Sequence, residues 1–367
     1  MEQIVAAAGE REFRAHQVSK WLYRQQVESF AQMTNLPAAL RAHLETDFAI
    51  GSADTEYVAR SADGTRKLLL RLNDGEAIES VIIPANDRVT LCISSQVGCA
   101  MECAFCATAL MGLRRNLEAA EIVGQVFAAQ RELGSGEELT NYVFMGMGEP
   151  LANYQRLRRA IAIMTAEWGM GISPRRITVS TVGLVPMMER LLNDTAVNLA
   201  VSLSATTNEQ REQIAPITRR YPLELLIETC RRLPLARRRR ITFEYVMLRG
   251  VNDSPADAAR LVKLMAPLRA KVNLICFNPF EGAAFESSPR CSIEAFQAIL
   301  HQGNLTATIR ESRGRDIAAA CGQLRQEMVF HTLPSDLSVE TVGVDCRSET
   351  ETVQIPPRVG KTGITDG

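Results

Sequence analysis

The sequence predicts an α/β fold organised as an open, partial (β/α)6-type barrel. From Arg88 onward, short apolar segments rich in Val, Ile and Leu alternate with longer amphipathic segments. Strict alternation of strands and helices is typical of a parallel sheet with right-handed crossovers. The alternation provides about six strand–helix units, fewer than the eight that close a barrel. The remainder of the 367 residues leaves room for appendages at both ends.

The individual elements follow from hydrophobic periodicity and from Gly, Pro and Asn at their ends. The expected strands are Val89–Ser94, Asn141–Met145, Arg176–Thr181, Val197–Ser202, Ile241–Met247, Val272–Phe277 and Leu305–Ile309. The expected helices are Leu117–Leu133, Tyr154–Trp168, Val185–Leu192, Pro222–Arg232, Pro255–Met265 and Ile293–Gln302.

Three further segments flank this barrel, which we expect to span 89–330. Residues 1–50 have helical periodicity, with Val18, Trp21 and Leu22 on one face, and form a candidate RNA-binding module. Residues 51–88 predict a β-hairpin extension that turns at Asn73-Asp74-Gly75. Residues 331–367 are rich in Ser, Thr, Pro and Gly and predict a polar tail.

Composition narrows the class of protein. The formal net charge is −1, and no apolar run is long enough to span a membrane, so we expect a cytoplasmic protein without a membrane partner. We also expect a monomer. Nine cysteines in such a chain indicate metal-binding, catalytic or buried thiols more than a disulfide framework. Six arginines within residues 231–240 could neutralise phosphates, although solvated helix ends explain such a run equally well.

The most informative motif is C-x3-C-x2-C, formed by Cys99, Cys103 and Cys106 directly after the first barrel strand. Thiolates are the ligands that zinc and iron–sulfur clusters prefer. A structural zinc site needs a fourth ligand, and the sequence has no second paired Cys or His motif. Three ligands leave one coordination position open for a small molecule. Three buried thiols that pack as small apolar side chains are the alternative.

Polar residues follow several of the other strands. Gly148 and Glu149 come after the second strand, Ser180 ends the third, Ser202 and Ser204 end the fourth, and Asn278 follows the sixth. In parallel barrels, ligands bind at the carboxyl ends of strands. A serine there more often caps a turn than contacts a ligand, so position alone assigns no role.

The amino-acid sequence of residues 94–108 resembles that of the radical S-adenosylmethionine (SAM) superfamily and, more closely, that of the RlmN/Cfr family of RNA adenine methyltransferases. Further resemblance lies in residues 13–17, 21–23, 146–150, 217–223 and 315–324. The resemblance implies a [4Fe-4S] cluster held by Cys99, Cys103 and Cys106, with SAM chelating the open iron. By the same resemblance, SAM contacts Gly148, Glu149, Ser180, Ser202, Leu203, Ser204 and Asn278, although the family often has His at the position of Ser204.

The resemblance also assigns roles to two cysteines outside the motif. Cys321 corresponds to the family's methyl-carrying cysteine, and Cys92 would release the product by attacking Cys321 to form a transient disulfide. A carrier is chemically reasonable because a C–H carbon of adenine is a poor nucleophile toward SAM, whereas a thiolate is a good one. Two SAM molecules are used per turnover, one as methyl donor and one as radical source. Glu79 occupies the family's proton-acceptor position, and Cys92 competes for that role.

The expected substrate is an adenine of 23S rRNA, methylated at carbon 2, with an adenine of the tRNA anticodon loop as a further substrate. The expected electron donor is flavodoxin or ferredoxin. The main alternative is Cfr-type methylation at carbon 8 of the same rRNA adenine, which no residue of this sequence distinguishes. A zinc-stabilised RNA-binding protein and a radical SAM enzyme acting on a small molecule are alternatives from other classes.

Overall fold

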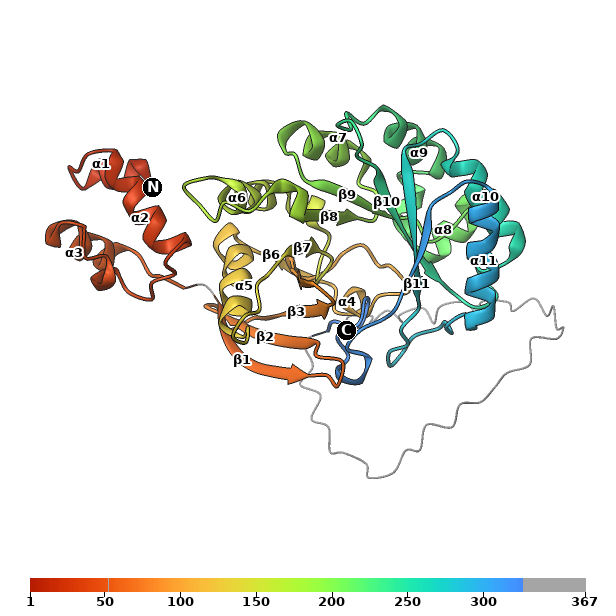
Figure 1. The fold of residues 1–367 in the computed structure, drawn as a ribbon, viewed down its shortest axis with the longest axis horizontal. Helices are drawn as coiled ribbons and strands as arrows, with labels where there is room; N and C mark the ends of the chain where they lie inside the picture. Colours follow the sequence, from red (N-terminus) through yellow and green to blue (C-terminus); the bar gives the residue numbers. More distant parts are fainter. Residues whose placement is uncertain (52, 326–367) are drawn as a thin grey trace, which may run out of the picture.

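The computed structural model describes residues 1–51 and 53–325, and its centre is a ten-stranded sheet (Figure 1). The strand order is β1-β2-β3-β4-β7-β8-β9-β10-β11-β12. The strands are β1 (Ala53–Arg60), β2 (Arg66–Leu72), β3 (Ala77–Ala85), β4 (Arg88–Cys92), β7 (Asn141–Phe144), β8 (Ile177–Thr181), β9 (Asn198–Ser202), β10 (Ile241–Met247), β11 (Ala270–Cys276) and β12 (Ala307–Arg310).

Strands β4 to β12 of this sheet are parallel to one another, so their carboxyl ends meet at one edge. All seven expected strands are present, with bounds that differ by at most two residues from the expectation. The sheet is open, since β1 and β12 lie at opposite ends of the strand order. The predicted open α/β barrel is therefore confirmed.

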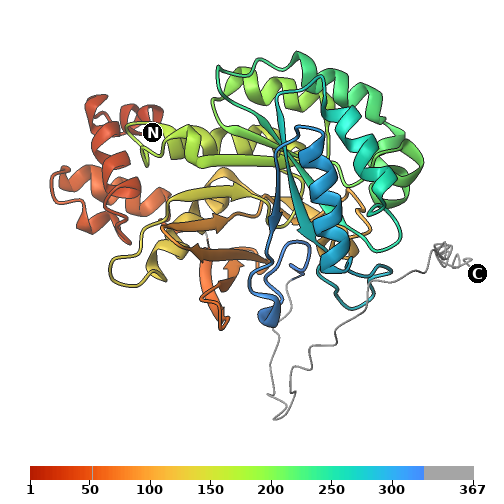
Figure 2. The ribbon, with the colours of Figure 1, turned by 45° about the vertical axis from the view of Figure 1, so that its right-hand side comes forward.

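Helices form an outer layer around the sheet (Figures 1 and 2). Each presents an apolar stripe to it: in α9, for example, Leu223, Leu226 and Cys230 are buried at helical spacing. The six expected helices are α5 (Ala119–Arg131), α6 (Tyr154–Thr165), α7 (Val185–Asp194), α9 (Leu223–Arg232), α10 (Pro255–Met265) and α11 (Arg290–Gln302). The short helices α4 (Ala107–Leu110) and α8 (Asn208–Ile214) and the hairpin β5 (Gln96–Gly98) with β6 (Leu113–Asn116) were not expected.

The hairpin extension continues the barrel sheet. Strand β3 pairs antiparallel with β4, which places Val81 opposite Cys92, and β2 and β1 extend the meander outward. Buried residues of β2 and β3 share one hydrophobic core with the barrel. The extension therefore forms a wall of the barrel beside its first parallel strand.

The N-terminal segment has a hydrophobic core of its own, formed by α1 (Glu2–Ala7), α2 (Phe13–Tyr23), η1 (Phe30–Gln32) and α3 (Ala38–Asp47). It contacts the loop after α6, where Arg24 donates hydrogen bonds to the carbonyls of Glu167 (2.9 Å) and Gly169 (2.7 Å). The expected polar tail, 331–367, lies outside the described residues, as does the end of the expected barrel segment.

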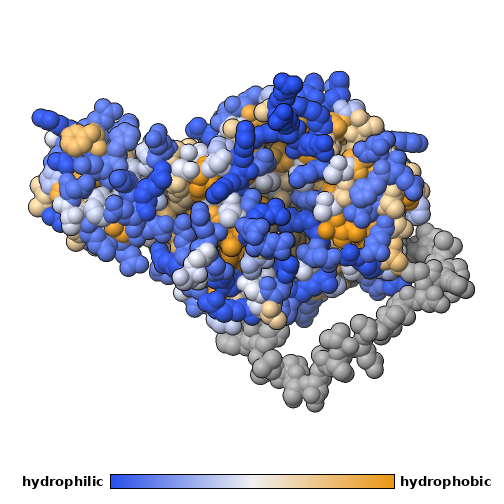
Figure 3. Space-filling view, in the orientation of Figure 1, coloured by the Kyte–Doolittle hydropathy of each residue, from blue (hydrophilic) through white to orange (hydrophobic). Residues whose placement is uncertain are grey.

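Between residues 1 and 325, leaving out residue 52, no helix combines the length and the apolar character that a membrane crossing requires. The molecular face in Figure 3 is mostly hydrophilic, with apolar side chains scattered over it.

Candidate active site

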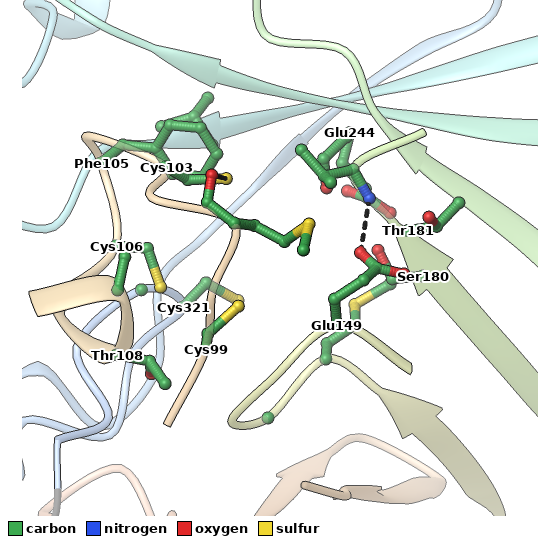
Figure 4. Close-up of a pocket in the computed structure, with 18 of the residues that line it drawn as sticks. Cys99, Cys103, Phe105, Cys106, Thr108, Glu149, Ser180, Thr181, Glu244 and Cys321 are labelled. Carbon is green, nitrogen blue, oxygen red and sulfur yellow. Dashed lines mark hydrogen bonds between the residues drawn. The ribbon is translucent and has the colours of Figure 1, made fainter. Parts of the chain in front are cut away.

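A pocket opens at the carboxyl ends of the parallel strands and collects residues from most of the barrel. Figure 4 shows two walls: the thiols of Cys99, Cys103, Cys106 and Cys321 lie on one side, and Glu149, Ser180 and Glu244 lie on the other. The remaining labelled residues are Phe105, Thr108 and Thr181. The sequence-predicted cysteine motif and several of the predicted strand-end residues therefore border one cavity.

Backbone contacts fix the cysteine loop at two points. Gly98 has a φ of +75°, and a Cβ there would lie 1.8 Å from the carbonyl oxygen of Gly112, so only glycine fits. The amide of Cys99 donates to the same Gly112 oxygen (3.0 Å). Farther along, the amide of Ala104 donates to Ile214 at the end of α8 (2.8 Å). The loop is thus fastened to the β5–β6 hairpin and to α8.

The three motif thiols are free, and their surroundings disfavour the ionised, thiolate form. Burial raises the pKa of Cys99 to about 12, and burial together with the neighbouring thiols Cys106 and Cys99 raises the pKa of Cys103 well above its usual value. Within the described ranges, no group of three His, Cys, Asp or Glu side chains is arranged to hold a metal ion. The thiols share a pocket without converging, and a soft cationic centre would supply the positive charge that their ionised forms need.

The facing wall is built around Glu149. The amides of Leu151 (3.0 Å) and Val182 (2.9 Å) donate to its two carboxylate oxygens, which ties the β7 and β8 ends together. Burial nevertheless raises its pKa to about 7. Gly148 approaches Gln96 so closely that a Cβ would lie 2.5 Å from the Gln96 Cβ. Beside these residues, the half-buried Ser180 and Ser202 line the pocket.

Leu203, Ser204 and Asn278 lie outside the residues that line this pocket. Leu203 belongs to the hydrophobic core. The Ser204 hydroxyl accepts a hydrogen bond from the amide of Val246 (3.2 Å), and its carbonyl accepts one from Asn252 (2.7 Å). Asn278 donates to the carbonyl of Cys321 (3.2 Å) and accepts from Arg315 (3.1 Å), so it supports the Cys321 loop.

Cys321 borders two pockets. The second pocket adjoins the first and is also lined by Cys92, Arg310 and Arg313. Cys321 is exposed, whereas Cys92 is buried, and both are free thiols. Burial, with a smaller contribution from the nearby Cys321, raises the pKa of Cys92 above its usual range. The fold thus brings Cys92 and Cys321, 229 positions apart in the printed sequence, to one cavity.

Glu79 lines neither pocket. Its side chain is fully buried, its Oε1 lies 2.9 Å from the ammonium of Lys67, and its Oε2 accepts a hydrogen bond from the amide of Arg325 (2.9 Å). In this state the carboxylate fastens the end of the Cys321 loop to β2 and β3.

Two charged residues of the site were missed from the sequence. Glu244, on β10, lines the first pocket, and its Oε2 has no hydrogen-bond partner within the described ranges. Arg211, on α8, is completely buried next to the pocket wall. A glutamate within the apolar run Ile241–Met247 was a usable signal for the first, whereas no local pattern marks Arg211 as buried.

The arginine run of residues 231–240 lies at the wrong edge of the sheet for this site. It precedes Ile241, where β10 begins, and so lies at the amino-terminal edge of the parallel strands. Arg231 and Arg232 pair with Glu228, and Arg239 donates to the carbonyl of Val197 (2.9 Å). These contacts favour the interpretation of the run as a solvated helix end.

Comparisons with known proteins define the class first. The radical SAM superfamily model matches residues 93–262, which include the three motif cysteines and the strand ends through β10, so the chain is a radical SAM enzyme. A second model, the ribosomal RNA large subunit methyltransferase N-terminal domain, matches residues 1–50. The chain belongs to the RlmN family of SAM-dependent RNA methyltransferases, as its relatives establish.

Two of these relatives are named dual-specificity RNA methyltransferase RlmN. The protein from Geobacter sulfurreducens is 52% identical over 328 residues, covering 89% of this chain and 90% of the relative. The protein from Desulfosudis oleivorans is 53% identical over 317 residues, covering 86% and 85%. The crystal structure of a radical SAM methyltransferase from Sphaerobacter thermophilus is 47% identical and superimposes with a TM-score of 0.85 over 89% of this chain and 96% of that chain.

Radical SAM enzymes use a [4Fe-4S] cluster and SAM, and the donor groups that border the pocket are of the types that suit both. Three thiols from one loop provide the soft donors. The opposite wall offers a buried carboxylate and two hydroxyls at a distance that leaves a cavity between them and the thiols (Figure 4). The donor set therefore agrees with a cluster on one wall and a small polar ligand against the other.

Proposed function

We propose that this protein methylates carbon 2 of an adenine in 23S rRNA, and an adenine in tRNA, through an S-methylated Cys321. The observation that carries the proposal is the position of Cys321, which borders the pocket of the three motif cysteines and the pocket of Cys92 at once. A carrier thiol needs this position because it must receive a methyl group in one place and deliver it to a base in the other.

In this proposal Cys99, Cys103 and Cys106 hold the cluster. Glu149 binds the amino group of SAM, Gly148 lets the backbone approach it, and Ser180 and Ser202 contact its polar groups. The support from geometry is weaker for Leu203, Ser204 and Asn278, whose polar atoms serve the protein's own backbone. The cluster with SAM supplies, when bound, the radical that removes a hydrogen atom from the methyl group on Cys321.

The protein's own residues then complete the transfer. The carbon carried by Cys321 bonds to the adenine, a base removes the ring proton, and the thiolate of Cys92 attacks the sulfur of Cys321. The sulfur–carbon bond breaks as the disulfide forms, and the released carbon takes up a proton to become the methyl group. The one electron left over from the radical addition would return to the bound cluster. Of the two candidate proton acceptors, Cys92 lines the second pocket, whereas Glu79 does not line it and is paired with Lys67. This state favours Cys92 unless the Cys321 loop moves.

The decisive experiment is mass spectrometry of an rRNA fragment after reaction with methyl-labelled SAM. We expect label on carbon 2 of one adenine, and none on a fragment in which that adenine is replaced by guanine. Label on carbon 8 would instead support the Cfr-type alternative. Label confined to a small molecule, with RNA unmodified, would overturn the proposal.

The substrate RNA is proposed to dock on the N-terminal module, residues 1–50, in addition to the pocket mouth. Deletion of this module should weaken RNA binding while SAM cleavage without RNA persists. Unchanged RNA affinity would reject the role of the module. A cytoplasmic monomer reduced by flavodoxin or ferredoxin completes the proposal.

A further inference from the structure

Arg211 is the largest completely buried side chain of the described residues and carries a charge. It extends from α8 toward the carboxyl ends of β8 and β9. Its guanidinium donates to the carbonyls of Val182, Leu203 (3.3 Å) and Ser202 (3.4 Å) and to the hydroxyl of Thr218 (2.9 Å). One side chain therefore joins the segments that follow two neighbouring strands of the site.

All of these acceptors are neutral. Among residues 1–51 and 53–325, no carboxylate forms an ion pair with Arg211. Burial of an uncompensated cation is costly, normally several kcal/mol per ion, even when its hydrogen bonds are satisfied. Burial lowers the pKa of Arg211 to about 10, so the side chain remains a cation at neutral pH. Arg211 is therefore a buried cation for which no described side chain supplies an anionic partner.

Arg211 reaches the wall of the pocket that the three motif cysteines border. Its acceptors Val182 and Ser202 both line that pocket. The same helix is fastened to the cysteine loop, because the carbonyl of Ile214 accepts the amide of Ala104 (2.8 Å). The cation and the loop are thus held in a fixed relation by α8.

We propose that Arg211 is a positioning residue that compensates the negative charge of the cluster site while it holds the β8 and β9 ends in place. The proposal rests on the assignment of Cys99, Cys103 and Cys106 as cluster ligands. Three thiolates outweigh the positive charge of the iron–sulfur core, so the ligated cluster is anionic, and its negative charge grows on reduction. A buried cation nearby therefore stabilises the reduced cluster more than the oxidised one and raises the reduction potential.

A clamp without an electrostatic role would behave differently. Loss of the clamp would loosen the strand ends and lower stability, but it would leave the preference of the cluster for its reduced state unaffected. Removal of the charge should move the potential itself. Variants that separate charge from hydrogen bonding therefore distinguish the two roles.

The test is an EPR-monitored redox titration of the reconstituted enzyme without RNA. Arg211→Gln, which removes the charge, should shift the potential to a more negative value. Arg211→Lys and Thr218→Val, which keep a cation but lose hydrogen bonds, should stay close to the unmodified protein. Arg239→Gln is the matched control, because Arg239 also donates to backbone carbonyls but lies at the opposite edge of the sheet. It should leave the potential unchanged.

A second measurement covers the case in which Arg211→Gln takes up the cluster poorly. The rise in Tm on cluster loading should be smaller for Arg211→Gln than for the unmodified protein and for Arg211→Lys. Each rise is measured against the apo form of the same protein, so any effect of the substitution on the apo fold cancels. Equal shifts for the Gln and Lys variants, or no shift for Gln in either measurement, would overturn the inference. Failure of the unmodified protein to bind iron and sulfide would instead overturn the proposed function.

Discussion

The ammonium of Lys67 lies 2.9 Å from the carboxylate of Glu79, and the two side chains are only 6% and 0% exposed. Lys67 also approaches the carbonyl of Ala318 (3.4 Å), while Glu79 accepts the amide of Arg325. The buried pair therefore holds both ends of the loop that carries Cys321. It connects β2 and β3 to the proposed methyl-transfer site through one contact on each side of Cys321.

Substitution Lys67→Met should destabilise the apo protein by about 3 kcal/mol or more, because it leaves a carboxylate buried without its partner. The double variant Lys67→Met with Glu79→Gln should be more stable than Lys67→Met alone. Chemical unfolding of Lys67→Met, Glu79→Gln, the double variant and the parent protein measures this coupling. Hydrogen exchange should also rise in residues 318–325. Additive losses in the two single variants would show that the pair does not act as a unit.

SAM affinity should increase as the pH rises through about 7. Burial raises the Glu149 pKa from 4.5 to about 7, so the carboxyl group is largely neutral at pH 6 and ionised at pH 8. Only the ionised form attracts the amino group of SAM. Equilibrium binding to the reconstituted enzyme should show this trend, and Glu149→Gln should bind SAM weakly with little dependence on pH.

The same raised pKa has a consequence for stability. Since the folded state binds this proton more tightly than the unfolded state, the contribution of Glu149 is favourable below about pH 4.5 and is lost as the pH rises toward 7. The Gln variant should lack this decline in the free energy of unfolding. A parent protein whose stability follows the variant at every pH would contradict the assignment.

Substitutions of Ser202 and Ser204 should affect SAM affinity and stability differently, although the two residues are only two positions apart. Ser202 lines the pocket, and Ser204 satisfies the amide of Val246. We expect Ser202→Ala to weaken SAM binding with little change in stability. Ser204→Ala should cost about 1 kcal/mol of stability and leave SAM affinity nearly unchanged. Isothermal titration and thermal unfolding of both variants test the contrast, and equal losses of affinity would place Ser204 in the binding site.

Cys321→Ala should retain the cluster and SAM cleavage without RNA, and should transfer no methyl group to RNA. Cys321 is the exposed residue among the cysteines that border the two pockets, so its removal takes away the carrier and leaves the cluster ligands in place. Cys230→Ala, at a buried cysteine away from both pockets, serves as the control and should keep full methylation. Methylated RNA from the Cys321 variant would exclude the carrier mechanism.

The local sequence was sufficient for the parallel strands, the outer helices and the cysteine motif. Hydrophobic periodicity reports which faces are buried, and the spacing of Cys99, Cys103 and Cys106 lies within one short loop. The strand-end rule placed Glu149, Ser180 and Ser202 at the same cavity, because parallel strands deliver their carboxyl ends to one edge. The short elements β5, β6 and α8 were not predicted because three to seven residues carry too little periodic signal.

Only the tertiary structure decided how distant residues meet. It brought Cys321 to Cys92, paired Glu79 with Lys67, turned the Ser204 hydroxyl toward the protein's own backbone and buried Arg211 without an anionic partner. It also placed the arginine run of residues 231–240 at the edge away from the site. These outcomes depend on contacts across the sheet between segments far apart in the chain. Local propensity carries no record of such contacts, whereas the chemistry of a short cysteine loop is complete within its own few residues.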